Sequence, residues 1–190
     1  MGVVLSSIDM DVDRCDYARA LGGKRQWESR LQRILFDPAR FRNLVHKMAA
    51  LWVSTKIDKI VAFEALGFPF GAALAFEMKL GLVLARKDLS TIEADVFDYE
   101  KFEDYDGGQK GLKIPRQAIK RNDRLLLVDD WIEDGHQVRA AIAIIKRLGG
   151  TVVGGVFLGM KSTHDGAHLQ DLRSVYRLEC IGTHVSAETE

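Results

Sequence analysis

Apolar residues recur at three- and four-residue spacing between positions 41 and 52, with polar residues between them. This spacing predicts an amphipathic helix of about four turns. Asp37 and Pro38 mark its start, because Asp is a favoured N-cap and Pro at the first helical position sacrifices no hydrogen bond. His46 falls on this helix and is expected at the surface. The apolar positions are Phe41, Leu44, Val45, Met48, Leu51 and Trp52.

A second helical stretch, residues 69–79, lies between two short apolar runs. The runs, residues 57–63 and 82–85, predict strands, and Gly81 ends the helix between them. A strand, a helix and a strand at this spacing form a βαβ unit, in which the strands are parallel and the crossover is right-handed.

The longest apolar run before a charged pair is Leu125-Leu-Leu-Val128. A continuous run of this kind is typical of a parallel strand covered on both faces. Residues 138–148 then predict a third amphipathic helix, which Gly149 and Gly150 end, because glycine suits the left-handed position after a helix. Residues 151–158 predict another buried strand. The alternation predicts an α/β fold with a doubly wound, mostly parallel sheet flanked by helices.

The chain shows no internal repeat and no low-complexity linker. We therefore expect one α/β domain over residues 34–190, preceded by a small appendage over residues 1–33. Residues 99–109 are acidic, aromatic and glycine-rich, which predicts a long mobile loop or a poorly regular hairpin. Long loops in compact domains are usually functional or disordered.

Composition narrows the range of partners. The 190 residues include 27 basic and 27 acidic side chains, so no overall field attracts nucleic acid or a membrane surface. No apolar run is long enough to span a bilayer, and the N-terminus lacks the pattern of a signal peptide. Cys15 and Cys180 are the only cysteines, which fits a reducing compartment. We expect a cytoplasmic protein with no nucleic-acid or membrane partner.

Two adjacent carboxylates, Asp129 and Asp130, follow the apolar run at residues 125–128. Open α/β sheets bind ligands at the carboxyl ends of their strands, and paired carboxylates there can hold sugar hydroxyls or water-bound Mg²⁺. The alternative is that the pair only ends a strand and starts a loop. The chain contains neither the Gly-x-x-x-x-Gly-Lys-Ser/Thr phosphate loop of ATPases nor the Gly-x-Gly-x-x-Gly turn of dinucleotide-binding proteins.

The segment Val128-Asp-Asp-Trp-Ile-Glu-Asp-Gly-His-Gln137 resembles the phosphoribosyl-diphosphate (PRPP) motif of type I phosphoribosyltransferases. Three further segments resemble adenine phosphoribosyltransferases in order and spacing, and the aromatic residue after the Asp pair looks more like xanthine phosphoribosyltransferases. The resemblance covers roughly residues 33–160. The three further segments are Ile34-Leu-Phe-Asp-Pro-Ala-Arg-Phe41, Phe63-Glu-Ala-Leu-Gly-Phe-Pro-Phe-Gly-Ala-Ala-Leu-Ala75 and Leu84-Ala-Arg-Lys87.

The resemblance implies an enzyme that transfers the 5-phosphoribosyl group from PRPP to a purine base and releases pyrophosphate. Asp129 and Asp130 would hold the ribose hydroxyls, and through them Mg²⁺ carried by PRPP. A loop at residues 133–137 would wrap the 5-phosphate with backbone N–H groups, helped by the N-terminus of the following helix. The loop residues are Glu133, Asp134, Gly135, His136 and Gln137.

The remaining roles implied by the resemblance surround this loop. Ala65, Leu66 and Gly67 would form the pyrophosphate loop, which often contains a cis peptide in this family. Arg86 and Lys87 would neutralise the diphosphate. Residues 99–109 would close over the reaction and exclude water, and residues 1–33 would form a hood. The loop acid would be Glu103 or Asp104, Lys161 would contact the base, and the enzyme would be a homodimer.

The chain departs from the family pattern at two places. Where the family has Thr-Gly-Gly-Thr, this chain has Asp134-Gly-His-Gln137, so two hydroxyl donors are replaced and a carboxylate enters a phosphate loop. The arginine usual in the pyrophosphate loop of adenine-type enzymes is Leu66. These departures keep a non-catalytic PRPP- or nucleotide-binding regulator on the same fold as an alternative. An enzyme that uses another phosphoribosyl acceptor is a third possibility.

Overall fold

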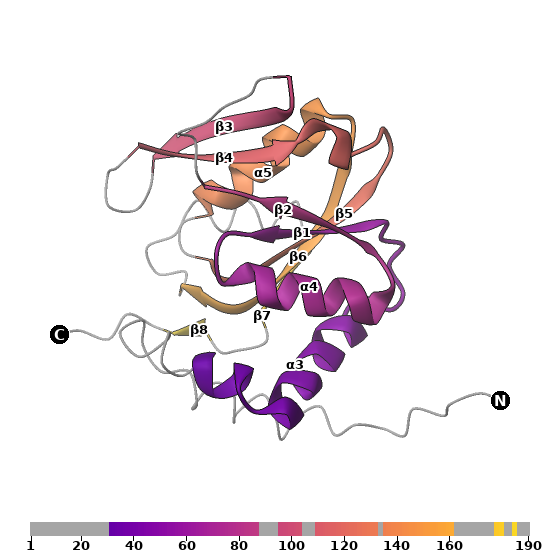
Figure 1. Cartoon of the computed structure of the whole chain (residues 1–190), viewed down its shortest axis with the longest axis vertical. Coiled ribbons are helices and arrows are strands. Elements are labelled where there is room, and N and C mark those ends of the chain that lie inside the picture. The colour runs from indigo at the N-terminus through magenta and orange to yellow at the C-terminus, as the bar shows by residue number, and fades with distance from the viewer. Residues whose placement is uncertain are drawn as a thin grey trace.

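The computed structural model describes residues 31–87, 95–103, 109–132, 135–161, 177–180 and 184–185 (Figure 1). Its elements are α3 (Pro38–Ala50), β1 (Lys59–Phe63), α4 (Gly67–Met78), β2 (Gly81–Ala85), β3 (Phe97–Glu103), β4 (Gln109–Pro115), the 3₁₀ turn η1 (Arg116–Ala118), β5 (Arg124–Ile132), α5 (His136–Arg147), β6 (Thr151–Lys161), β7 (Arg177–Cys180) and β8 (His184–Val185).

The main sheet is six-stranded, with the order β2-β1-β5-β6-β7 and with β8 paired to the far end of β6. Every pairing in it is parallel. β1 and β5 lie at its centre, so the βαβ unit and the Asp129–Asp130 strand meet side by side. The predicted α/β fold with a parallel sheet is confirmed.

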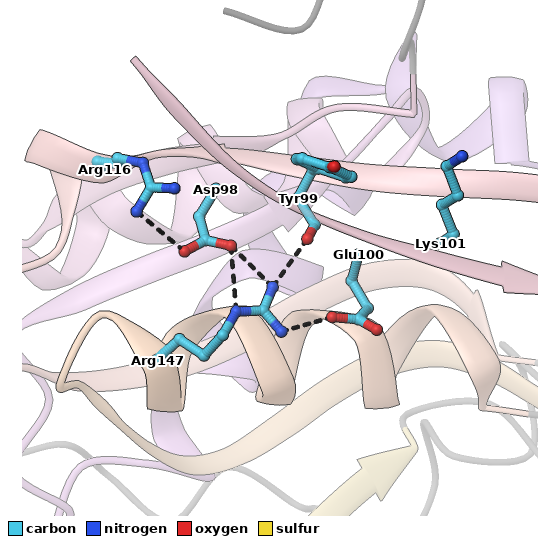
Figure 2. Close-up of a pocket in the computed structure, with 6 residues that line it drawn as sticks. All are labelled: Asp98, Tyr99, Glu100, Lys101, Arg116 and Arg147. Carbon is cyan, nitrogen blue, oxygen red and sulfur yellow. Dashed lines mark hydrogen bonds and ion pairs between the residues drawn. The ribbon is translucent and has the colours of Figure 1, made fainter. Parts of the chain in front are cut away.

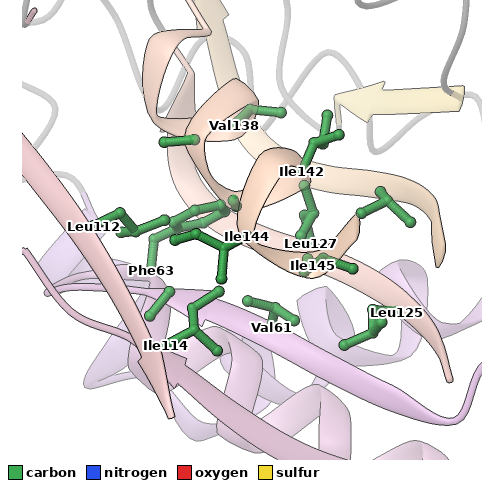
Figure 3. Packing of buried hydrophobic residues seen from close by; sticks show 14 of the residues in the cluster. Val61, Phe63, Leu112, Ile114, Leu125, Leu127, Val138, Ile142, Ile144 and Ile145 are labelled. Atoms are coloured by element: carbon green, nitrogen blue, oxygen red, sulfur yellow. The ribbon is translucent and has the colours of Figure 1, made fainter. Parts of the chain in front are cut away.

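Two hydrophobic clusters cover the two faces of the sheet. One face packs against α3 and α4, with Met48, Phe70 and Leu126 fully buried. The other packs against α5 and the β3–β4 hairpin, with Phe63 and Ile144 fully buried. Figure 3 shows this second cluster, in which isoleucines of α5 meet apolar residues of β1, β4 and β5. Burial on both faces is the reason that the strands read as unbroken apolar runs.

The helix ends follow the local chemistry. Asp37 caps α3 by accepting hydrogen bonds from the N–H groups of Ala39 and Arg40. Gly149 follows α5 with a φ of 85°, as the sequence predicts for a glycine stop. His46 is exposed, as expected, and bonds Glu77 of α4. None of the helices in the described part of the chain is long and apolar enough to cross a membrane.

Two strands run further than the sequence predicts. β5 continues past the Asp pair, because Trp131 and Ile132 pair with Gly159 and Met160 of β6. β6 likewise continues to Lys161, which pairs with Val185 of β8. Lys161 is therefore the last residue of β6. The predicted strand, residues 151–158, would have placed Lys161 beyond the strand end.

β3 and β4 form a regular antiparallel pair, so the described ends of the segment expected to be a mobile loop or irregular hairpin are strand, while residues 104–108 lie outside the described part of the chain. β3 and β4 pair without interruption from Phe97–Pro115 to Glu103–Gln109. Leu112 and Ile114 of β4 are fully buried against α5, which supplies the apolar face that stabilises a hairpin. The acidic, glycine-rich composition of residues 99–109 did not indicate that these two positions, which follow the segment, are buried.

The expected domain boundary at residue 33 falls inside a helical stretch, residues 31–35. Leu31 and Ile34, on either side of the boundary, are both buried in the cluster on the α3–α4 face. The end of the expected appendage is thus packed onto the α/β domain, and residues 1–30 lie outside the described part of the chain.

Candidate active site

Asp129 is a buried carboxylate near the carboxyl end of the central strand β5, with 7% of its surface exposed. Its Oδ1 accepts a hydrogen bond from the N–H of Asp130 at 2.9 Å, and its Oδ2 accepts one from Nε2 of Gln137 at 3.4 Å. Burial raises the pKa of Asp129 well above its usual value, and the charge of Asp130 raises it further. Asp130 itself is half-buried, so its carboxylate is the more accessible of the two.

The predicted pyrophosphate loop touches this carboxylate. The peptide between Glu64 and Ala65 is cis, at the place where the family resemblance implies one. Gly67 lies so close to β5 that a Cβ there would be 2.7 Å from Oδ1 of Asp129 and 3.0 Å from the Val128 carbonyl oxygen. Glycine is thus required at position 67 by the close approach of two backbones.

Glu64 organises the cations that follow β2, a role that the sequence analysis missed. Its carboxylate accepts hydrogen bonds from Nη2 of Arg86 at 3.3 Å and from the backbone N–H of Lys87 at 2.7 Å. The charge of Lys87 also lowers the pKa of Asp129 slightly, against the dominant effect of burial. Arg86 and Lys87 therefore lie at the same end of the sheet as the Asp pair, as predicted. The signal available in the sequence was the acid directly after the β1 apolar run.

The predicted phosphate loop leads into the N-terminus of α5. Gly135 is its N-cap with a φ of 77°, a left-handed conformation that glycine adopts without strain. His136 and Gln137 are the first residues of the helix, where free backbone N–H groups and the helix dipole favour an anion. Glu133 and Asp134 lie outside the described residues.

The end of β3, from which the predicted loop acid comes, lies near this helix end. Glu103 is the last residue of β3, while Asp104 lies outside the described residues, so no side-chain geometry tests either prediction. Phe102, next to Glu103, lines a hollow of about 390 Å³ together with His136 and Arg139 of α5. The distal end of β3 and the start of α5 thus share one hollow. The side chain of Lys161 also remains undescribed, and its role stays a prediction.

The residues present suit a Mg²⁺ ion that a bound ligand carries into the site. Mg²⁺ prefers oxygen ligands and usually retains several waters beside one or two carboxylates. Within the described ranges no three His, Cys, Asp or Glu side chains cluster as a metal site. The half-buried carboxylate of Asp130 is a suitable oxygen donor for a hydrated ion that a diphosphate brings in, which fits the indirect role predicted for the Asp pair.

The sequence therefore predicted four segments that the fold brings together at the carboxyl ends of β1, β2 and β5. Gly67, Asp129 and Gln137 meet directly, and Arg86 and Lys87 join them through Glu64. A buried carboxylate, a helix N-terminus and two cations suit a ligand that carries both hydroxyls and phosphates.

Comparison with known proteins identifies the family of this arrangement. Residues 33–181 match the phosphoribosyl transferase domain model. The adenine phosphoribosyltransferase of Maricaulis maris is 34% identical over 158 residues, covering 81% of this chain and 82% of the relative. The enzyme of the same name from Dinoroseobacter shibae is 38% identical over 127 residues, covering 64% of this chain and 66% of the relative.

Solved structures of phosphoribosyltransferases are also similar to this chain. The adenine phosphoribosyltransferase of Thermoanaerobacter pseudethanolicus superposes with a TM-score of 0.70 at 28% identity, over 78% of this chain and 83% of that chain. The Saccharomyces cerevisiae enzyme, solved with an imino-altritol bisphosphate and adenine, superposes with a TM-score of 0.61 at 25% identity, over 77% and 81% of the two chains. The family and enzyme class inferred from the motifs are confirmed, and the chain belongs to the phosphoribosyltransferase family.

Proposed function

We propose that the protein is an adenine phosphoribosyltransferase, which transfers the 5-phosphoribosyl group of PRPP to adenine and releases pyrophosphate. The observation that carries the proposal is the meeting of Gly67, Asp129 and Gln137, because it joins the pyrophosphate loop, the ribose-binding strand and the phosphate-binding helix at one point. Adenine is the acceptor named for the relatives that cover four-fifths of this chain.

In this proposal PRPP lies across the carboxyl ends of β1 and β5. Asp130, the more accessible carboxylate, accepts hydrogen bonds from the ribose hydroxyls, while buried Asp129 holds the strand against Gly67 and Gln137. The N-terminus of α5 receives the 5-phosphate through backbone N–H groups and the helix dipole. His136 and Gln137 take the place of the hydroxyl donors that the loop lacks.

Departure of the diphosphate leaves positive charge on the ribosyl carbon, so the leaving group must be neutralised as it forms. Arg86 and Lys87 are the cations available next to the pyrophosphate loop. Mg²⁺ bound to the diphosphate would add to this neutralisation. Glu103 or Asp104, at the distal end of the hairpin, would handle the proton of the base.

We also propose that the enzyme is a homodimer that uses the outer edge of the sheet. Phe76 of α4 is 88% exposed, and Leu82 and Leu84 of the edge strand β2 are each 39% exposed. An exposed apolar surface of this kind on an edge strand is typical of an interface. Sedimentation of the wild type beside Phe76→Glu tests it: we expect a dimer and a weakened dimer respectively, and a wild-type monomer at micromolar concentration contradicts it.

A non-catalytic regulator remains the second candidate, because Leu66 replaces the usual arginine and Asp134-Gly-His-Gln137 replaces the hydroxyl-rich loop. The deciding experiment measures pyrophosphate release from PRPP with adenine, guanine, xanthine and hypoxanthine, and the heat of PRPP binding with Mg²⁺. We expect turnover with adenine. Binding of PRPP without turnover on any base supports the regulator, and the absence of PRPP binding contradicts both candidates.

A further inference from the structure

A cluster of charged residues joins the last turn of α5 to the outer strand of the hairpin (Figure 2). The guanidinium of Arg147 donates from Nε and Nη2 to Oδ1 of Asp98 at 3.2 and 2.7 Å, and from Nη2 to the Tyr99 carbonyl oxygen at 2.8 Å. Its Nη1 donates to the Glu100 carboxylate. One side chain of α5 therefore contacts three consecutive residues of β3.

Among the described residues, this contact is the main polar attachment of β3 to α5. β4, its partner strand, is fixed by buried Leu112 and Ile114 and by a backbone bridge between Lys113 and Arg86. Along the part of β3 whose burial is described, Tyr99 and Lys101 are exposed, the charged Asp98 is buried, and Phe102 packs half-buried against the apolar cluster. Arg116 gives Asp98 a second cation at 3.3 Å. Apart from its ladder to β4 and the packing of Phe102 against the apolar cluster, the contacts described for β3 are polar, and Arg147 provides most of them.

The geometry of α5 and β3 connects this cluster to the candidate active site. β3 runs antiparallel to α5, since Asp98 meets Arg147 at one end while Phe102 and His136 line a common hollow at the other. From His136 to Arg147 the helix rises about 16 Å, at about 1.5 Å per residue. From Asp98 to Glu103 the strand also rises about 16 Å, at about 3.3 Å per residue. Fixing Asp98 at Arg147 therefore brings the backbone end of β3 level with the amino end of α5.

The contact also specifies register. Arg147 needs acceptors at two alternate positions of β3 and a carbonyl between them, which Asp98, Tyr99 and Glu100 supply. A slip of one residue turns the carboxylates to the opposite face of the strand. A slip of two residues would place the apolar ring of Phe102 where the Glu100 carboxylate is now. Only the planar fork of arginine satisfies all these acceptors together.

We propose that Arg147 is a positioning residue, which fixes the register of β3 on α5 and so holds the end of β3 level with the amino end of that helix, where the phosphate is expected to bind. The catalytic part of this inference rests on the proposed function; the positional part does not. Arg147 is not expected to touch the substrate; it acts through β3, the strand that it holds.

The test compares Arg147→Met with Lys146→Met, which removes an exposed cation from the same last turn of α5 and so controls for charge and helix dipole. We expect kcat for pyrophosphate release to fall about 10- to 100-fold in Arg147→Met, because a displacement of about 1 Å at a catalytic group costs on the order of 100-fold. The KM for PRPP should change by less than about threefold, since the phosphate site is intact. Amide exchange in residues 97–103 should accelerate only in Arg147→Met.

The conservative variant Arg147→Lys keeps the charge and loses the fork, so it should lose activity as well; it carries the test where Arg147→Met does not fold. Equal kcat in Arg147→Met and Lys146→Met overturns the catalytic part of the proposal, as does a loss confined to the KM for PRPP. If the wild-type protein turns over no base, the proposed function fails, and exchange alone decides the positional part. Equal exchange in the two variants then overturns it.

Discussion

The two ends of the parallel sheet treat the same type of side chain in opposite ways. At the amino ends of the strands, Asp123 accepts hydrogen bonds from Nζ of Lys59 and from the N–H of Lys120, and Asp58 accepts one from the N–H of Arg124. At the carboxyl end, Asp129 is buried beside a second acid, Asp130, and accepts a hydrogen bond from the N–H of Asp130 and a long one from Nε2 of Gln137.

The pKa values of the two aspartates reflect this difference. Burial acts to raise the pKa of Asp123, but the hydrogen bonds from Lys59 and Lys120 outweigh it, and the net pKa is lowered. The pKa of Asp129 is raised by burial and by its acidic neighbour. One end of the sheet thus pairs an aspartate with lysines, while the other buries an aspartate beside a second acid, an arrangement typical of a binding site.

The largest effect should come from Asp130→Ala, which removes the carboxylate that we assign to the ribose. A hydrogen bond to a charged group contributes about 1.5–3 kcal/mol, so the loss of two should lower kcat/KM about 100-fold or more. Because Asp130 is half-buried on the ligand side, unfolding in urea should shift little. A wild-type kcat/KM in this variant would show that Asp130 does not bind the ribose.

Asp123→Asn should reverse this pattern. It removes the counter-charge of Lys59, whose side chain is only 21% exposed, and leaves at most a neutral amide oxygen and the Ala118 carbonyl as acceptors for that ammonium. We expect the free energy of unfolding at pH 7 to fall by about 1–3 kcal/mol, with kcat/KM unchanged below the unfolding transition. Urea titration beside the activity assay checks both. A drop in activity without a drop in stability would contradict the division between the two ends of the sheet.

Asp129→Asn should weaken PRPP binding and stabilise the fold by about 1 kcal/mol at pH 7, the usual scale of such exchanges.

A carboxyl whose pKa is raised by folding, such as that of Asp129, binds more protons in the native state, so stability falls as pH rises from 3.8 through the folded pKa. Asp123 acts in the opposite direction: its stabilisation is present above 3.8 and is lost as pH falls through the lowered folded pKa. Urea midpoints between pH 3 and pH 7 should show a flatter neutral limb in Asp129→Asn and a flatter acid limb in Asp123→Asn.

The smallest effect should come from Glu77→Gln, which removes the contact to His46 between α3 and α4. Both side chains are well exposed, at 40% and 48%, so the free energy of unfolding should change by less than about 0.5 kcal/mol. Activity should not change. A larger loss would mean that the exposed face of the helices contributes to stability as the amino end of the sheet does.

Elements set by local rules could be predicted from the sequence. The Asp37–Pro38 start of α3, the glycine stop after α5 and the buried runs of β1 and β5 each depend on neighbouring residues alone. The position of the Asp pair near the carboxyl end of β5 was predicted in the same way, although the strand continues for two residues past it.

Features that depend on distant residues could not be predicted in this way. β3 and β4 pair regularly because Leu112 and Ile114 pack against α5. Arg147 contacts Asp98, which is 49 positions away in the sequence. Glu64 was missed because an acid after a strand commonly only ends it, and its partners Arg86 and Lys87 become neighbours only once β1 and β2 pair. The paths of residues 133–134 and of the hairpin tip lie outside the described residues, so those predictions stand untested.

The closeness of Gly67 to Asp129 has a consequence for redesign. An engineer who wished to restore the arginine of adenine-type enzymes would substitute Leu66, which packs partly against the α3–α4 cluster and lies one residue before the glycine. The backbone at 66 can be displaced only as far as Gly67 permits, since Val128 and Asp129 already occupy the space beside it. Any backbone adjustment that an arginine at position 66 needs must therefore come from residues 64 and 65, and mutational libraries should vary residues 64 to 66 together while keeping Gly67.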